Sequence, residues 1–334
     1  MKNRDIKKIT VLGDGGWGTA LAVLLAGKGF EICLWSAFKD NAARINKNRE
    51  NRVFLPGIIL PENITVVSDT GLAVADTDMV VIAIPSQFLR QTIQRLKGFD
   101  LSGKTLVSVV KGIENNTFHR PSEIIRLELG GLEIGVLSGP TIAIEIAKGL
   151  PASCVSACRD LYIAGVIQSV FTTDRFRVYT STDVAGVETA GALKNIMAIA
   201  SGISDGLGLG SNAKAALFTR GLVEMKRLGL ALGAQEATFN GLSGMGDLVT
   251  TCVSSFSRNR KLGEDIAKGK TLSLILQGMS MVAEGVETTR SVYNYSAKLG
   301  IEMPITEQVY KVLFEDKPPY KAVIDLMLRE SKPE

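Results

Sequence analysis

The chain has 334 residues, enough for about two domains at roughly 150 residues each. Apolar residues make up 46% of it and charged residues 22%, a balance that excludes intrinsically disordered, collagen-like and coiled-coil proteins. The net charge is only +4, with both signs mixed along the chain, so we expect neither nucleic acid nor an anionic membrane surface as a partner.

Cellular location can be predicted from two further features. The longest apolar runs are far shorter than the roughly 18 residues that a membrane-spanning helix needs, so we expect no stable membrane insertion. The four cysteines form no CxxC pair and are too few for a disulfide framework in so long a chain. These observations predict a protein of the reducing cytoplasm.

Eight short runs rich in Val and Ile alternate with helical patterns in the first part of the chain. This alternation predicts stacked βαβ units. A run that is apolar on both faces is typical of a central parallel strand covered by helices on each side. We therefore predict an α/β domain with a doubly wound, Rossmann-type parallel sheet, whose strands lie at 7–13, 31–35, 64–69, 79–85, 105–112, 134–140, 152–158 and 175–180.

The strand pattern stops after about Thr180, where Ala, Gly, Leu and Met begin to recur at helical spacing. A polar turn at 181–186 precedes this change. We predict a dinucleotide-binding domain over 1–180 and an all-helical substrate and catalytic domain over 181–330.

A glycine-rich loop follows the first predicted strand and opens a helical pattern. In that context GxGxxG is a strong dinucleotide-binding signal, although a plain glycine-rich turn is the alternative. Gly13 permits the tight turn, Gly15 lets the main chain approach a pyrophosphate, and Gly18 allows close packing of helix on strand. The helix N-terminus favours negative charge.

The residues after the second strand bear on cofactor choice. An NAD-specific fold usually has an acidic residue there to bind the ribose 2′-hydroxyl, whereas this chain continues with Ser36, Ala37, Phe38 and Lys39. Without a carboxylate nothing repels a 2′-phosphate, to which Ser36 and Lys39 could donate. We expect NADP(H), with NAD(H) as a second possibility because Asp40 follows one turn later.

Ligands of such sheets collect at the carboxyl ends of the strands, where three segments combine small and charged residues. They read IAIPSQF, VVKGIE and LSGPTIAIE. In the second, Lys111 can face an anion, although an ordinary solvated lysine fits the local sequence equally well.

The chemistry of hydride transfer to a ketone needs a proton donor at the developing alkoxide. His119 is the one histidine and lies in a polar stretch, so neither a histidine acid nor a metal site is expected. No tyrosine has a lysine four residues later, so the Tyr-x-x-x-Lys arrangement is also absent. A lysine or a carboxylic acid remains.

Lys194 is the best candidate because it lies in an otherwise apolar helical segment, where desolvation should lower its pKa from about 10.4. A lysine that snorkels from a half-buried helix is the alternative. Asn195 beside it can orient a ligand hydroxyl.

Two further segments, GLSGMGDLVTTC and SSFSRNRK, combine glycine or serine with charge. Asp247 in the first could pair with Lys194, and Thr251 lies one turn later. In the second, Arg258 offers a planar fork for a phosphate, and Ser257 and Asn259 flank it. A solvated basic helix start is the alternative for this segment.

Ten stretches in this order resemble the bacterial NAD(P)-dependent glycerol-3-phosphate dehydrogenases over nearly the whole chain. They are GDGGWGTALA, VVIAIPSQF, VVKGIE, SGPTIAIEIAKGLP, ETAGALKNIMAIASGISDGLGLGSNAKAAL, TRGLVEMKRLG, GMGDLVTTC, SRNRKLG, VAEGVETT and EMPITEQVY. The resemblance implies reversible reduction of dihydroxyacetone phosphate to sn-glycerol 3-phosphate, a phospholipid precursor, by a cytoplasmic homodimer.

The resemblance also implies residue roles. Lys194 becomes the proton donor and acceptor, assisted by Asn195, Asp247 and Thr251. The substrate-side positions are Lys111, Gly139, Thr141, Asp247, Ser257, Arg258 and Asn259. Besides Gly13, Gly15 and Gly18 of the loop, the cofactor-side positions are Gly16, Trp17, Ser36, Lys111, Ala143, Arg258, Val282 and Glu284.

The sequence departs from the family pattern at Ser36–Phe38, where an Arg or His is frequent, and at Ile142 and Ile144. Neither departure removes a polar group that the proposed reaction needs. Two other hypotheses stay open: a two-domain reductase acting on 3-hydroxy acids, and a regulatory module that binds the dinucleotide without turnover.

Overall fold

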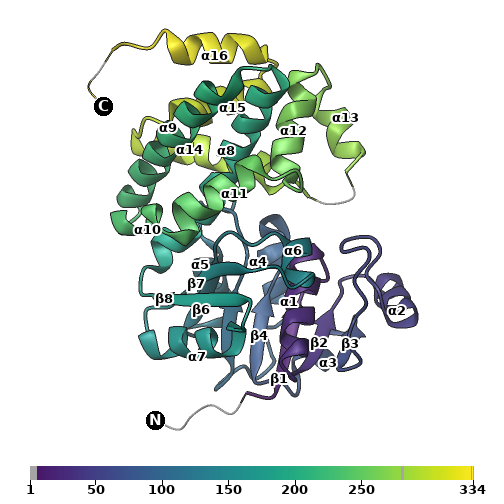
Figure 1. Cartoon of the computed structure of the whole chain (residues 1–334). Coiled ribbons are helices and arrows are strands. Elements are labelled where there is room, and N and C mark those ends of the chain that lie inside the picture. Colours follow the sequence, from purple (N-terminus) through teal and green to yellow (C-terminus); the bar gives the residue numbers. More distant parts are fainter. Residues whose placement is uncertain (1–5, 280–281, 332, 334) are drawn as a thin grey trace. The chain divides into compact units, whose positions relative to one another are not determined.

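The computed structural model describes residues 6–279, 282–331 and 333 and divides into two compact units. The first unit comprises Met1–Lys111 with Arg120–Glu188, and the second comprises Gly112–His119 with Thr189–Glu334. Figure 1 labels most of their helices and strands. The chain passes from the first unit to the second for the last time within helix α8, Val184–Gly206.

An eight-stranded sheet forms the first unit, with strand order β3-β2-β1-β4-β5-β6-β7-β8. The order reverses at β1, which lies between β2 and β4, and such a switch point is where ligands bind in doubly wound sheets. The strands are β1 (Lys8–Leu12), β2 (Glu31–Trp35), β3 (Ile64–Val67), β4 (Met79–Ile82), β5 (Thr105–Ser108), β6 (Ile134–Ser138), β7 (Ala152–Ala157) and β8 (Phe176–Ser181).

All eight predicted runs form strands, and the doubly wound Rossmann-type fold is confirmed. The expectation of parallel pairing throughout is wrong at one place, because β7 runs antiparallel to β6. Only the five-residue helix α6 separates these two strands, too short a helix for the crossover that a parallel neighbour needs.

Two apolar layers hold helices against the sheet, one on each face. The first layer joins α1 and α7 to the sheet, and the second joins α3, α4 and α5 to the other face. All four residues of β4 are fully buried, as expected for a central strand covered on both sides. The helices are α1 (Gly16–Gly27), α2 (Lys39–Asn48), α3 (Thr70–Val74), α4 (Ser86–Gln94), α5 (Pro121–Leu129), α6 (Ala143–Ala147) and α7 (Leu161–Phe171).

The described part of the second unit is helical, as predicted, and no helix described in the chain is long and apolar enough to cross a membrane. The segment 112–119 belongs to it: Asn115 donates to Glu287 at 2.6 Å and the Phe118 ring stacks on Tyr295. After α8 come α9 (Gly210–Ala231), α10 (Glu236–Asn240), a π-helical turn (Leu242–Gly246), α11 (Asp247–Val253), α12 (Arg258–Ala267), α13 (Leu272–Gln277), α14 (Glu284–Leu299), α15 (Pro304–Phe314) and α16 (Pro319–Met327).

Helices α8 and α12 cross with their backbones in contact. A Cβ atom on Gly202 would lie 1.9 Å from the Arg260 carbonyl oxygen, and one on Gly263 would lie 2.1 Å from the Ile199 carbonyl oxygen. Each helix therefore presents a glycine to the other's main chain. This contact fixes α12 beside the C-terminal part of α8.

A buried carboxylate accepts hydrogen bonds from the first turn of helix α15. Pro304 occupies the first turn, and Glu224 of α9 accepts hydrogen bonds from the main-chain N–H groups of Ile305 at 2.5 Å and Thr306 at 3.2 Å. Glu224 is only 2% exposed, and burial raises the pKa of its carboxyl group to about 7. The carboxyl group therefore binds a proton more readily in the folded protein than in the unfolded chain.

The Glu224→Gln variant should remove a pH dependence of stability. A raised folded-state pKa gives stability that is complete below about pH 4.5 and is lost as the pH rises to about 7. Relative to the variant, the wild type should lose on the order of 3 kcal/mol over that interval. Thermal unfolding followed by circular dichroism measures both proteins, and parallel pH profiles would contradict the prediction.

Candidate active site

The glycine loop connects β1 to α1, and two of its glycines are required by packing within the first unit. Gly13 has a φ of +116°, and a Cβ there would lie 2.4 Å from the Ala83 carbonyl oxygen. A Cβ on Gly18 would lie 2.0 Å from the Gly13 carbonyl oxygen. These two positions keep β1, β4 and the start of α1 in close contact.

Gly15 is not explained by packing, because a Cβ built on it would meet no atom within 4 Å. It precedes the first turn of α1, and no side chain caps that helix end. Nearby, the Trp17 indole Nε1 is buried and has no hydrogen-bond partner among the described residues. Open space, a free helix N-terminus and an orphaned donor fit the pyrophosphate and sugar of a dinucleotide.

Polar side chains that the sequence analysis missed hold this loop. The buried Asn51 donates from Nδ2 to the Asp14 carbonyl oxygen at 2.6 Å and to the Thr19 hydroxyl at 2.9 Å. Asn41 of α2 donates to the Asp14 carboxylate. Asparagines in a segment between strands carry no pattern that ties them to a distant loop, so only the fold reveals this support.

The segment after β2 lies at the carboxyl end of the sheet, as the glycine loop after β1 does, because these two strands are parallel neighbours. Ser36 is fully buried, and its hydroxyl exchanges hydrogen bonds with the Phe38 main chain at 3.2 and 3.3 Å. Lys39 is exposed in the first turn of α2. Of the two donors expected here, only the Lys39 ammonium is directed to solvent.

The segments after β5 and β6 converge on one carbonyl oxygen. The Gly139 carbonyl oxygen accepts from Lys111 Nζ at 3.1 Å and from the Thr141 hydroxyl at 3.0 Å. A Cβ on Gly139 would lie 2.8 Å from the Cys154 Cα, so β7 requires glycine there. Ala143 opens α6, and its Cβ would lie 3.9 Å from one on Gly16.

In the second unit, Lys194 forms a buried ion pair. The Lys194 side chain projects from α8, is 6% exposed as a residue, and pairs through Nζ with the Asp247 carboxylate. Nζ also donates to the Thr251 hydroxyl at 2.7 Å, and that hydroxyl donates to the Asp247 carbonyl oxygen at 2.7 Å. The three side chains form one hydrogen-bonded cluster that orients the ammonium group.

A π-helical turn, Leu242–Gly246, precedes Asp247, and such turns are frequent at functional sites. A Cβ on Gly244 would lie 2.2 Å from the Phe239 carbonyl oxygen, so this turn depends on glycine. The glycines before Asp247 therefore allow close backbone packing, and this packing positions the Asp247 carboxylate beside Lys194.

The starts of α12 and α14 lie side by side next to this cluster. Asn259 accepts through Oδ1 from the Gly285 N–H at 3.0 Å, and Arg258 donates to the Val282 carbonyl oxygen at 2.7 Å. A Cβ on Gly285 would lie 2.8 Å from the Asn195 carbonyl oxygen. Because Asn259 Oδ1 accepts this hydrogen bond, the NH₂ group on the other side of the amide is oriented to donate to a different acceptor.

The predicted site residues thus form one group in each unit. The first brings together the glycine loop and Lys111, Gly139, Thr141 and Ala143. The second brings together Lys194, Asp247 and Thr251 with Asn195, Asn259, Arg258 and Val282. Ser257 caps α12 through a bond from the Arg260 N–H, and Glu284 begins α14.

The described residues contain no cluster of three or more His, Cys, Asp or Glu able to hold a metal ion.

Comparisons with known proteins agree on one family. Residues 8–164 match the family model described as the N-terminus of NAD-dependent glycerol-3-phosphate dehydrogenase, and residues 183–324 match that of its C-terminus. A glycerol-3-phosphate dehydrogenase [NAD(P)+] of Prosthecochloris aestuarii is 49% identical over 98% of this chain and 99% of its own. The crystal structure of the Coxiella burnetii glycerol-3-phosphate dehydrogenase superposes with a TM-score of 0.94 at 38% identity, covering 97% of this chain and 99% of that one.

Proposed function

Because this chain belongs to the NAD-dependent glycerol-3-phosphate dehydrogenase family, we propose that Lys194 transfers the proton in the reversible reduction of dihydroxyacetone phosphate to sn-glycerol 3-phosphate. The chain is an NAD(P)-dependent oxidoreductase. The single observation that carries the assignment to Lys194 is its buried pair with Asp247, held in place by Thr251.

The substrate phosphate binds at the start of α12. Arg258 supplies a planar guanidinium fork and Asn259 an amide NH₂ group, both of which suit phosphate oxygens. Helices α12 and α14 both begin here, and each N-terminus adds favourable partial positive charge. Binding energy gained at the phosphate positions the carbonyl group for reaction.

Lys194 donates its proton to the carbonyl oxygen as negative charge develops there. Burial excludes water from Nζ, and the Asp247 carboxylate stabilises the ammonium form before transfer. Asn195, Lys111 and Thr141 are the further substrate-binding residues of this proposal. In the reverse direction the neutral amine accepts the proton from glycerol 3-phosphate.

The cofactor binds at the glycine loop, with its pyrophosphate against Gly15 and the N-terminus of α1. The reduced nicotinamide, when bound, supplies the hydride. The residues that would hold the dinucleotide besides the loop glycines are Gly16, Trp17, Ala143, Arg258, Val282 and Glu284. The exposed Lys39 and the lack of a carboxylate at 36–39 favour NADP(H) over NAD(H).

Replacing Gly15 by alanine should separate folding from cofactor binding. The φ of −62° at Gly15 suits alanine and no atom lies near the new Cβ, so the melting temperature should stay unchanged. The methyl group fills the space that the pyrophosphate needs, so NADPH binding should weaken at least tenfold, about the loss of one charged hydrogen bond. Fluorescence titration with NADPH measures this, and unchanged affinity would contradict the loop's role.

The functional division that fits these roles is a cofactor domain over 1–180 and a substrate domain over 181–330. The activity of this chain supplies glycerol 3-phosphate for phospholipid synthesis. The chain works as a homodimer in the cytoplasm, in keeping with the family to which it belongs.

A spectrophotometric assay of the purified full chain tests the proposed reaction. NADPH oxidation should depend on dihydroxyacetone phosphate and should form an equal amount of glycerol 3-phosphate. Unphosphorylated dihydroxyacetone is the matched control and should react far more slowly, because Arg258 and Asn259 would have no phosphate to bind. Equal rates with both ketones, or no oxidation with either, would reject the proposal.

A further inference from the structure

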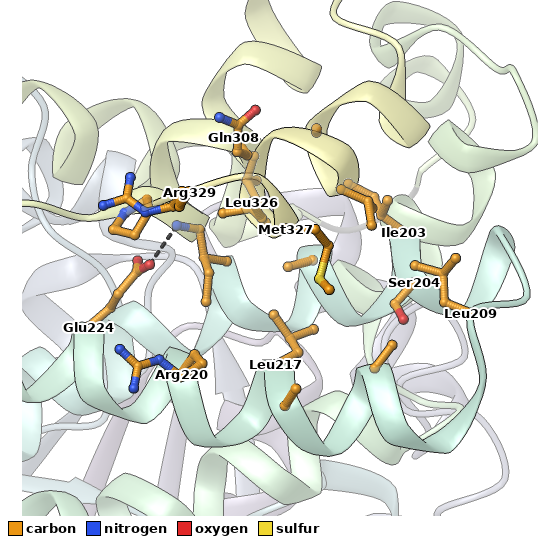
Figure 2. Close-up of a pocket in the computed structure, with 18 of the residues that line it drawn as sticks. Ile203, Ser204, Leu209, Leu217, Arg220, Glu224, Gln308, Leu326, Met327 and Arg329 are labelled. Carbon is orange, nitrogen blue, oxygen red and sulfur yellow. Dashed lines mark hydrogen bonds between the residues drawn. The ribbon is translucent and has the colours of Figure 1, made fainter. Parts of the chain in front are cut away.

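A cavity of about 510 Å³ lies within the second unit, enclosed by α8, α9, α15 and α16 (Figure 2). Its volume is typical of small-molecule sites. Most of its lining is aliphatic, including Ile203, Leu217, Val309 and Leu326, and none of the residues assigned above to catalysis or cofactor binding lines it.

One end of the cavity is charged. Figure 2 shows Arg220, Glu224 and Arg329 together there, with Leu217 and Met327 farther along. The Glu224 carboxylate is bonded to the main chain of α15, and Arg329 pairs with Glu302 at 3.2 Å. Arg227 donates to the Glu302 carbonyl oxygen, and Glu330 is among the residues that line the cavity.

Arg220 differs from these neighbours, because it has no ion-pair or hydrogen-bond partner among the described residues. Its helix places Glu224 one turn away, but that carboxylate is already bonded to Ile305 and Thr306. A half-buried guanidinium without a partner is available for an anion.

A second unpartnered polar group lies at the opposite end, beside Leu209 (Figure 2). The hydroxyl oxygen of Ser204 is buried and has no hydrogen-bond partner in the described structure, and the residue is only 7% exposed. Buried hydroxyl groups are normally bonded, so this one favours a ligand with a polar atom at that depth.

We propose that this cavity is a second ligand site, which binds an elongated amphipathic anion with its acid group at Arg220 and its aliphatic body between α9 and α16. A polar group at the far end of such a ligand reaches Ser204. The site is separate from the dehydrogenase reaction, and its test is a binding measurement that does not depend on activity.

Isothermal titration calorimetry of the full chain with decanoate, below its micelle-forming concentration, tests the proposal. Decanoate should saturate one site per chain, and decanol, which lacks the charge, should bind at least tenfold more weakly. Arg220→Ala should weaken decanoate binding about tenfold and leave decanol binding unchanged. Arg95→Ala, at an exposed arginine of the first unit, should change neither.

The far end of the cavity gives a second test. The ligand ω-hydroxydecanoate should bind the wild type more tightly than decanoate, and Ser204→Ala should abolish that preference. Ala213→Phe should fill the cavity and block all three ligands while the melting temperature is kept. No saturable binding of decanoate, equal affinity for decanol, or unchanged affinity in Arg220→Ala would overturn the proposal.

Discussion

Replacing Lys194 by alanine is expected to lower kcat/KM for dihydroxyacetone phosphate by about 10²- to 10⁴-fold, the usual contribution of a general acid. The amine is the buried proton donor of the cluster, and no other described group of that cluster carries a transferable ammonium proton. NADPH binding should be retained, because the glycine loop lies in the first unit. Steady-state kinetics and NADPH titration measure the two quantities.

Two control variants separate chemistry from stability. Lys194→Arg keeps a positive charge but cannot give up its proton, so it should be as inactive as the alanine variant. Removing the lysine alone leaves the Asp247 carboxylate buried without a cation, at a cost of about 3–5 kcal/mol, which Lys194→Ala with Asp247→Asn should largely restore. Substantial turnover by Lys194→Arg would show that the charge, and not the proton, matters.

Gly263→Ala is expected to destabilise the second unit by several kcal/mol, because its methyl group would lie 2.1 Å from the Ile199 carbonyl oxygen. Neither backbone can move without shifting α12 along α8. Arg258 and Asn259 would then move relative to Lys194, so the KM for dihydroxyacetone phosphate should rise in the protein that still folds. Thermal unfolding and initial-rate kinetics measure both effects.

The matched control is Gly165→Ala in α7. No atom lies within 4 Å of a Cβ at that position, so alanine should stabilise the helix by about 0.5–1 kcal/mol and leave KM unchanged. Equal behaviour of the two alanine variants would show that the α8–α12 crossing tolerates a side chain and does not set the geometry of the site.

The fold was predictable from the sequence because its signals are local. A run such as 79–85 is apolar on both faces, and the structure buries all four residues of β4. The direction of β7 was not predictable in this way. The run at 152–158 does not by itself set the direction of the strand, and the short α6 connection distinguishes the two pairings.

One contact of the candidate site, the buried ion pair of Lys194, was predictable from the sequence. A lysine in an apolar helix requires a partner, and Asp247 is that partner in the structure. A glycine sequence, in contrast, does not say whether it serves a ligand or a backbone contact. Gly15 has open space around it, whereas Gly202, Gly263 and Gly285 contact other helices, and only the packing shows the difference.

The contacts that two asparagines make with elements distant in sequence had no signal in the chain. Asn51 holds the glycine loop, and Asn259 bonds the first turn of α14, yet both asparagines look like ordinary polar residues in the chain. Local pattern therefore suggests the candidate groups, and tertiary packing decides how each one is oriented.

A crystal structure of the chain with NADPH and sn-glycerol 3-phosphate bound together tests the central claim most directly, because two reduced ligands cannot react. Lys194 Nζ should lie within hydrogen-bond distance of the oxygen on the secondary carbon, with Arg258 and Asn259 on the phosphate. A complex in which Nζ still contacts only Asp247 and Thr251, while another protein group bonds that oxygen, would contradict the account.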